Sequence, residues 1–99
     1  MLRISKNNAK AILSNVPEDK VFWVCDGKVL RNLQELSTAL AGMSEETFKY
    51  HLNKDKNDFK NWILDVIGDK KLAADISKAM TRGALIKKLN RRISQLESL

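Results

Sequence analysis

The stretch that most constrains the fold of this chain is residues 58–67, which read DFKNWILDVI. Its large apolar side chains recur at positions i, i+3, i+4, i+7 and i+8, a spacing that places them on one face of an α-helix. They are Phe59, Trp62, Ile63, Val66 and Ile67. Asn57 or Asp58 can cap the start of this helix, and Gly68 can end it. Because two aromatic rings on one helix face need cover, the rest of the chain must supply a core around them.

Helical periods and capping residues continue on both sides of this stretch. Apolar residues repeat at three- and four-residue spacing, and a Ser, Asn, Asp or Thr precedes each repeat. The predicted helices are residues 5–15, 32–42, 44–52, 58–67, 70–80 and 82–99, with Ser5, Asn32, Ser44, Asp69 and Thr81 as N-caps of the five other than 58–67. In the helix at 70–80 we expect Met80 on the inner face, together with Leu72 and Ile76.

Residues 21–30, which read VFWVCDGKVL, predict a β-hairpin. Two runs of β-branched or aromatic residues flank Asp26-Gly27, a pair that favours a type I′ turn. A two-stranded hairpin is marginal alone, so we expect it to lie on the helices with Phe22 or Trp23 as its anchor. The aromatic side chains at 22, 23, 48, 59 and 62 are expected in the core rather than on a base-stacking surface, with one exposed ring at an interface as the alternative that the pattern leaves open, and Cys25 is expected to be buried.

These elements predict a mainly α fold, a compact bundle of five to six short helices with one small β-hairpin near the N-terminus. The 99 residues, of which 43% are apolar, suffice for one modest core, so residues 1–99 are interpreted as a single domain. Its parts are the hairpin at about 21–30, a helical core at about 32–80 and a basic C-terminal helix at about 82–99.

The sequence also limits the compartment in which we expect the protein. The longest apolar run, Val21 to Cys25, is far too short to cross a membrane. The first ten residues, MLRISKNNAK, lack the apolar stretch of a secretory signal. The single cysteine, Cys25, excludes an intramolecular disulfide and a cysteine-based zinc site. We therefore expect a cytoplasmic protein without membrane contact.

The basic charge of the chain is concentrated near the C-terminus. The 18 basic residues exceed the 12 acidic ones by six, and no acid lies between Asp75 and Glu97. That interval holds all six excess charges, on Lys78, Arg82, Lys87, Lys88, Arg91 and Arg92. On a helix, residues 87 and 91 and residues 88 and 92 are one turn apart, which predicts a continuous cationic stripe. Such a stripe is typical of a helix that binds nucleic-acid phosphates, although a solvated surface helix has the same pattern.

The same C-terminal helix carries an apolar seam, Ile86, Leu89, Ile93 and Leu96, spaced by three and four residues. The seam predicts a surface that docks on the domain itself, on another protein or on a second copy of the chain. The helices at 58–67 and 70–80 also have the lengths of a helix-turn-helix, but the second has no Arg, Asn or Gln to read base edges. Any DNA contact is therefore expected to involve the backbone.

The single histidine, His51, is followed by Asp55 and Asp58. A lone histidine with carboxylates at loop spacing is a weak sign of acid–base or metal chemistry, so we interpret His51 as a structural residue bonded to a backbone carbonyl or to Asp58. The chain has no nucleophile motif and no Gly-rich phosphate loop. We therefore predict a protein that is not an enzyme and has no metal, cofactor or small-molecule substrate.

Residues 21–75 combine an aromatic strand, a leucine helix, a Phe and a His three residues apart, Asn-Asp-Phe, Trp-Ile, and Leu-Ala after an Asp. The positions that carry this pattern are Phe48, His51, Asn57, Asp58, Phe59, Trp62, Ile63, Asp65, Leu72 and Ala73. The pattern resembles a small uncharacterised helical domain family of archaea and bacteria. That family has no established function, so the resemblance implies no activity. It implies that four of these residues act as one structural turn unit, namely His51, Asn57, Asp58 and Trp62.

Together these features predict a small basic cytoplasmic binding module. The first function that we expect is sequence-non-specific binding of double-stranded DNA, as in nucleoid-associated proteins. Its phosphate contacts would come from Lys78, Arg82, Lys87, Lys88, Arg91 and Arg92. The alternative is a protein-interaction or dimerisation module that uses the apolar seam. The two are compatible because a dimer would present two cationic stripes, and we expect a homo-oligomer.

Overall fold

Helices make up most of the molecule, as predicted. The computed structural model describes residues 4–99, which contain six α-helices and one two-stranded antiparallel hairpin. The elements are α1 (Lys6–Leu13), the 3₁₀-helix η1 (Glu18–Lys20), β1 (Phe22–Trp23), β2 (Val29–Leu30), α2 (Leu33–Gly42), α3 (Glu45–His51), α4 (Asp58–Trp62), the π-helix η2 (Ile63–Ile67), α5 (Lys70–Ile76) and α6 (Arg82–Glu97). Within residues 4–99, no helix combines the length and the apolar character needed to span a bilayer.

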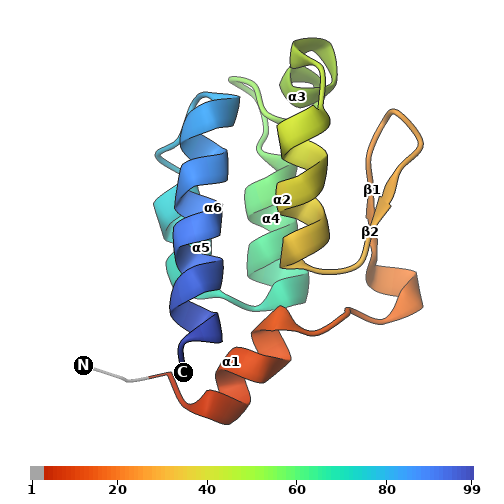
Figure 1. Cartoon of the computed structure of the whole chain (residues 1–99). Coiled ribbons are helices and arrows are strands. Elements are labelled where there is room, and N and C mark those ends of the chain that lie inside the picture. Colours follow the sequence, from red (N-terminus) through yellow and green to blue (C-terminus); the bar gives the residue numbers. More distant parts are fainter. Residues whose placement is uncertain (1–3) are drawn as a thin grey trace.

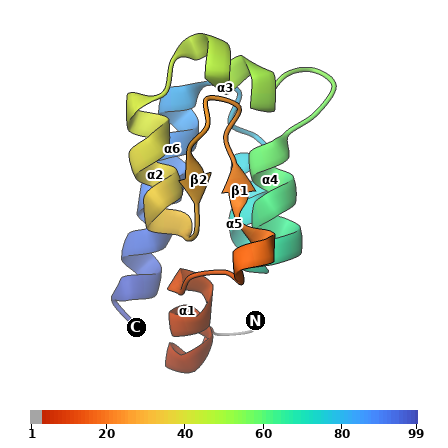
Figure 2. The ribbon, with the colours of Figure 1, turned by 90° about the vertical axis from the view of Figure 1, so that its right-hand side faces the viewer.

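The long helix α6 organises the packing, because it contacts α2, α1 and α5. In Figure 1, α2 and α6 run alongside one another, α3 lies at one end of the bundle and α1 at the other. Figure 2 shows the hairpin on the side of the bundle between α2 and α4. The buried apolar side chains of these elements form one cluster, so the hairpin and the helices share a core.

Each α-helix begins at a capping residue that the sequence predicts. The side-chain oxygens of Ser5, Asn32, Ser44, Asn57, Asp69 and Thr81 each accept a hydrogen bond from the N–H three residues later. A cap of this kind stabilises a helix by about 1 kcal/mol, which matters for helices that are too short to persist alone. The position at which each helix begins is therefore specified by a local hydrogen bond.

The helix predicted at 58–67 is real, but its second half is a π-helix. After Trp62 the chain widens, and the Gly68 N–H donates to the Ile63 carbonyl over five residues at 2.8 Å. Gly68 then ends the element in the left-handed region, with φ of 84°. A single wide turn leaves Phe59, Trp62 and Ile63 buried but Val66 and Ile67 only partly buried. Side-chain spacing over five residues does not distinguish a π-turn from an α-turn, which is why the prediction missed it.

The helix predicted at 70–80 is also shorter than expected, because α5 ends at Ile76. The Ser77 hydroxyl donates to the Ala74 carbonyl at 2.6 Å, and the chain turns away there. Ala79 still reaches the core, but the prediction for Met80 was wrong, since its side chain is 66% exposed. Met80 thus lies in the segment between α5 and α6 rather than on an inner helix face.

The hairpin forms where it was predicted, but its turn differs. Asp26 does not adopt a positive φ, so the turn is not type I′. Instead Cys25, Asp26 and Gly27 form a three-residue loop in which Gly27, with φ of 100°, takes the left-handed position. The Gly27 N–H donates to the Val24 carbonyl at 2.9 Å, and the Asp26 carboxylate accepts from the Lys28 N–H at 3.0 Å.

The aromatic core is built around the buried ring of Phe59. The Phe22 ring stacks on it at 5.4 Å and the Phe48 ring at 5.8 Å, while the Trp62 ring meets Phe22 edge-on at 5.7 Å. Phe22 is therefore the anchor of the hairpin. Trp23 is the one exposed ring among the five aromatic side chains considered, and the prediction that Cys25 is buried was wrong, because its side chain is exposed. Alternation along the strand explains this, since turning Phe22 inward turns its neighbour outward.

Candidate functional site

The apolar seam of the C-terminal helix is not available to a partner. Leu89, Ile93 and Leu96 are buried in the core of the domain, together with Leu85. Only Ile86 remains partly exposed. The predicted partner interface is therefore wrong for three of its four residues, because α6 uses this face to pack on α1, α2 and α5.

The predicted cationic stripe is divided by the same packing. Lys87 and Arg91 point to solvent and Lys88 is half-buried. Arg92 is 6% exposed, so the expectation that it lies on an exposed stripe was wrong. Its Nε donates to Asp69 Oδ2 at 2.8 Å and its Nη2 donates to Asp69 Oδ1 at 3.1 Å. One row of the stripe is thus exposed, and the other turns toward α5.

Asp69 joins two helices through one carboxylate. Its Oδ1 accepts from the Leu72 N–H at 3.1 Å and caps α5, while both oxygens bind Arg92 of α6. A buried ion pair is tolerated only when hydrogen bonds offset the loss of hydration, and this carboxylate accepts three. The pair therefore fixes the position of α5 against α6 and shapes the space between them.

The guanidinium of Arg82, which the sequence predicted to contact phosphates, is already hydrogen-bonded within the protein. Its Nη1 donates to the carbonyls of Leu40 and Ala41 at 2.9 and 3.2 Å, and its Nε donates to Glu45 Oε1 at 3.2 Å. Both carbonyls lie at the end of α2, where Leu40 otherwise accepts only a long bond of 3.4 Å from the Met43 N–H. Arg82 is thus committed to holding the start of α6 on α2 and α3. Lys78, by contrast, is exposed.

A polar cleft of about 170 Å³ lies between α5 and α6. We call it the α5–α6 cleft, and its lining residues are Lys71, Asp75, Lys88, Arg91, Arg92 and Gln95. Four of these side chains are cationic and one is acidic. Lys71 Nζ lies 3.0 Å from Asp75 Oδ2, in a pair that is largely exposed to water. Such a pair contributes little to stability, so Lys71 can exchange its partner for another anion at low cost.

The buried guanidinium of Arg92 forms part of the lining of this cleft. A guanidinium has five N–H donors, and Asp69 accepts from two of them. A third lies 3.5 Å from Gln95 Oε1, which is a long contact. Donors therefore remain for an anion that enters the cleft. Lys71 was not among the predicted binding residues, because only the packing of α5 against α6 brings it beside Lys88 and Arg91.

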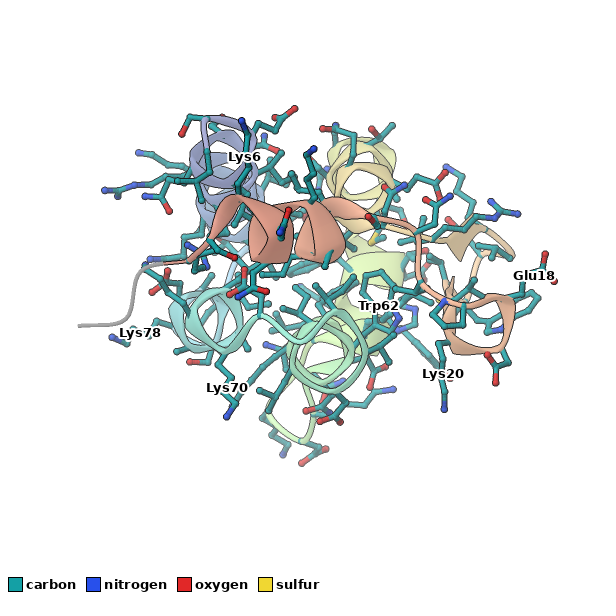
Figure 3. The ribbon with its side chains drawn as sticks, turned by 90° about the horizontal axis from the view of Figure 1, so that it is seen from below. Lys6, Glu18, Lys20, Trp62, Lys70 and Lys78 are labelled. Carbon is teal, nitrogen blue, oxygen red and sulfur yellow. The ribbon has the colours of Figure 1, made fainter. Side chains whose placement is uncertain are left out.

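Two further exposed lysines, which do not line the cleft, lie at the start of α5 and just after its end. Figure 3 shows Lys70 of α5 and Lys78, which follows α5 in the chain, extending away from the centre of the bundle. Together with Lys71, Lys87, Lys88 and Arg91 they make six cations that are at least partly exposed, against one acid, Asp75. The arrangement favours phosphate or carboxylate groups and disfavours cations.

The predicted turn unit lies on the opposite side of the core and is closed. His51 is 3% exposed, its Nδ1 lies 2.9 Å from Asp58 Oδ2, and its Nε2 accepts from the Cys25 N–H at 3.0 Å. The backbone donor identifies Nε2 as the unprotonated nitrogen, so Nδ1 donates to Asp58. Both ring nitrogens are occupied, and neither is free for proton transfer. His51 thus fastens the hairpin loop to α3 and α4.

The other members of the predicted unit act at separate contacts. Asn57 caps α4 by accepting from the Lys60 N–H at 3.0 Å. The Trp62 indole Nε1 donates to the Lys20 carbonyl at 2.8 Å, which fastens η1 to α4 as Figure 3 shows. Within residues 4–99, no group of three or more His, Cys, Asp or Glu side chains is placed to hold a metal ion.

Comparison with known protein families, with curated proteins and with solved structures finds no match for this chain. The resemblance to a small domain family therefore stays a prediction, and the arguments about function depend on the geometry of the chain itself.

Proposed function

We propose that the protein binds the phosphate backbone of nucleic acids through the α5–α6 cleft. The observation that carries the proposal is the convergence of cationic side chains from two helices on one polar cleft. Lys71, Lys88 and Arg91 would contact phosphates directly, while the buried Arg92 would hold the cleft in shape and offer its free N–H groups.

The charges around the cleft support a polyanion rather than a small neutral ligand. Beyond the cleft, Lys70 of α5, Lys78 between the two helices and Lys87 of α6 add exposed positive charge, and a phosphate chain can contact several of these at once. Arg82 takes no part, because its guanidinium is bonded to α2 and α3. Phosphate contacts fix position without reading sequence, so the expected binding is non-specific.

The proposal is tested by removing the cleft cations and comparing the result with an equal loss of charge elsewhere. The cleft variant replaces Lys71, Lys88 and Arg91 with Gln, and the control variant replaces Lys10, Lys20 and Lys28, which are exposed and do not line the cleft. Wild-type affinity for a fluorescent random duplex should be on the order of 1–100 μM at physiological salt. The cleft variant should bind at least about tenfold more weakly than the control, because only it loses phosphate contacts. Equal affinities of the two variants would contradict the proposal.

A further inference from the structure

A second hollow lies on another part of the surface, between α3 and the start of α6. It has a volume of about 740 Å³, and we call it the α3–α6 groove. Apolar side chains form its floor, namely Phe48, Leu52, Met80 and Ile86. Met80 is largely exposed there, and Ile86 is the one member of the apolar seam that the core does not bury. The groove therefore offers apolar surface to a partner.

The groove continues past Met80 into a smaller hollow of about 260 Å³ beside residues 53–57. The two hollows share Leu52, Asn53, Lys54 and Met80, so they form one elongated depression. The lining of the two hollows runs from α3 through residues 53–57 to Lys60, Ser77, Met80 and the start of α6. An extended or helical segment of another chain is a better fit to this shape than a compact small molecule.

The rim of the groove is cationic. The lining of the two hollows contains five basic residues, Lys49, Lys54, Lys56, Lys60 and Arg82, against two acidic ones, Glu45 and Asp55. Arg82 is paired with Glu45, and Lys56 with Asp58. Among residues 4–99, Lys49, Lys54 and Lys60 form no ion pair with a side chain. A partner that fills the groove would therefore satisfy these charges best with carboxylates.

The beginning of α6 adds to this preference. Thr81 Oγ1 accepts from the Ala84 N–H at 3.2 Å, and the N–H groups of Arg82 and Gly83 have no partner within the helix. Gly83 borders the groove, and a Cβ atom added there would meet no atom within 4 Å. The helix start is thus open to an incoming acidic side chain.

We infer that the α3–α6 groove binds an acidic amphipathic helix of another protein. The apolar face of that helix would lie on Met80, Ile86 and Leu52, and its acidic flanks would face Lys49, Lys54 and Lys60. A second copy of this chain lacks such a helix, because its large exposed apolar side chains are scattered singly: Trp23, Tyr50, Leu64, Met80 and Leu99 among residues 4–99. The inference is independent of nucleic-acid binding, since no residue of the α5–α6 cleft lines this groove.

The inference is tested with a designed peptide as the probe. A fluorescent helical peptide would carry Leu at i, i+3, i+4 and i+7 and Glu at the flanking positions, and a matched peptide would carry Lys in place of each Glu. The acidic peptide should bind the full chain at least about tenfold more tightly than the basic one, because only the acidic one complements the rim. No binding of the acidic peptide, or equal binding of the two, would overturn the inference.

Two substitutions locate the bound peptide, and a third serves as the control. Met80→Glu and Gly83→Glu place an acid in the groove, and neither should disturb the fold, because Met80 is exposed and Gly83 faces open space. Each substitution should lower the affinity for the acidic peptide by about tenfold, because the new carboxylate repels the glutamates of the peptide. The helical circular-dichroism signal of the protein should be unchanged. Trp23→Glu changes a side chain of matched exposure, 69% against 66%, outside the groove and should leave the affinity unchanged. Equal losses in all three would overturn the assignment. So would a wild-type dimer that Met80→Glu converts to a monomer, because the groove would then hold a second copy.

Discussion

Two corners of the molecule place a basic side chain on an aspartate at the start of a helix, and they differ in what surrounds the pair. At the start of α5, Asp69 binds Arg92 beside a cleft that four cationic side chains line. At the start of α4, Asp58 binds His51 and Lys56, and the histidine ring is enclosed by Phe22, Phe59 and Tyr50. Similar local chemistry thus lies beside the proposed binding surface in one place and forms a structural joint in the other. The corner at Asp69 differs from the corner at Asp58 in having unneutralised positive charge and an open cleft beside the pair.

The largest expected effect comes from breaking the pair beside the cleft. Arg92→Ala would leave the Asp69 carboxylate buried without its cation, which should lower the free energy of unfolding by about 3–5 kcal/mol. Urea denaturation followed by circular dichroism measures this loss. The double variant Asp69→Asn, Arg92→Met is the control, because it removes both charges and should recover part of the stability. A loss below about 1 kcal/mol in the single variant would show that the pair is accessible to water.

A smaller effect is expected at the closed corner. His51→Phe keeps a ring between Phe22 and Phe59 but leaves the Cys25 N–H without its acceptor, which should cost about 1–3 kcal/mol of unfolding free energy. Its affinity for duplex DNA should equal that of the wild type, since His51 is on the other side of the core from the cleft. A variant that unfolds normally but loses DNA binding would show that this corner belongs to the binding surface.

The smallest effects on stability are expected for one lysine at each corner, Lys71 and Lys56, and their substitutions give the clearest comparison of the two corners. Lys71 and Lys56 each lie 3.0 Å from a carboxylate oxygen, and the Lys71 pair is exposed to water whereas the Lys56 pair is half-buried. Lys71→Gln and Lys56→Gln should each change the free energy of unfolding by less than about 1 kcal/mol. Only Lys71→Gln should weaken duplex binding, and titrations of the two variants under identical conditions check this. If Lys56→Gln weakened binding as much as Lys71→Gln, the contrast between the corners would fail.

Local signals in the sequence predicted the helices well. The capping residues and the apolar spacing depend on contacts within a few residues, so five N-caps were identified outright, namely Ser5, Asn32, Ser44, Asp69 and Thr81, and the sixth, Asn57, was one of two candidates. The sequence did not indicate the direction in which exposed residues near the helix ends would point. The Met80 side chain is exposed because the chain turns early, at Ser77. The Trp23 side chain is exposed because its neighbour Phe22 is the hairpin anchor and points inward.

The candidate site was predicted only in part, because it depends on how two helices meet. The spacing of Lys88, Arg91 and Arg92 identified the basic helix but not which row faces α5. From the sequence alone, Arg92 is indistinguishable from the other cations of the stripe. Its partner Asp69 is 23 residues away in sequence, and only the fold brings Asp69 Oδ2 to 2.8 Å from Arg92 Nε. Lys71 joins the site for the same reason. The apolar seam likewise has the same spacing whether it packs within the domain or against a partner, and α6 packs it within the domain.

The central claim is that the α5–α6 cleft binds nucleic-acid phosphates, and the salt dependence of duplex binding tests it most directly. It is measured by fluorescence anisotropy for the wild type and for the variant with Gln at Lys71, Lys88 and Arg91. Each phosphate contact adds about one unit to the slope of log affinity against log salt, so the loss of three cations should make the variant slope shallower than the wild-type slope by about three units. That result would support the α5–α6 cleft as the phosphate-binding site. A variant slope equal to the wild-type slope, or no wild-type binding at about 50 mM salt, would contradict the claim, because counterion release is most favourable at low salt.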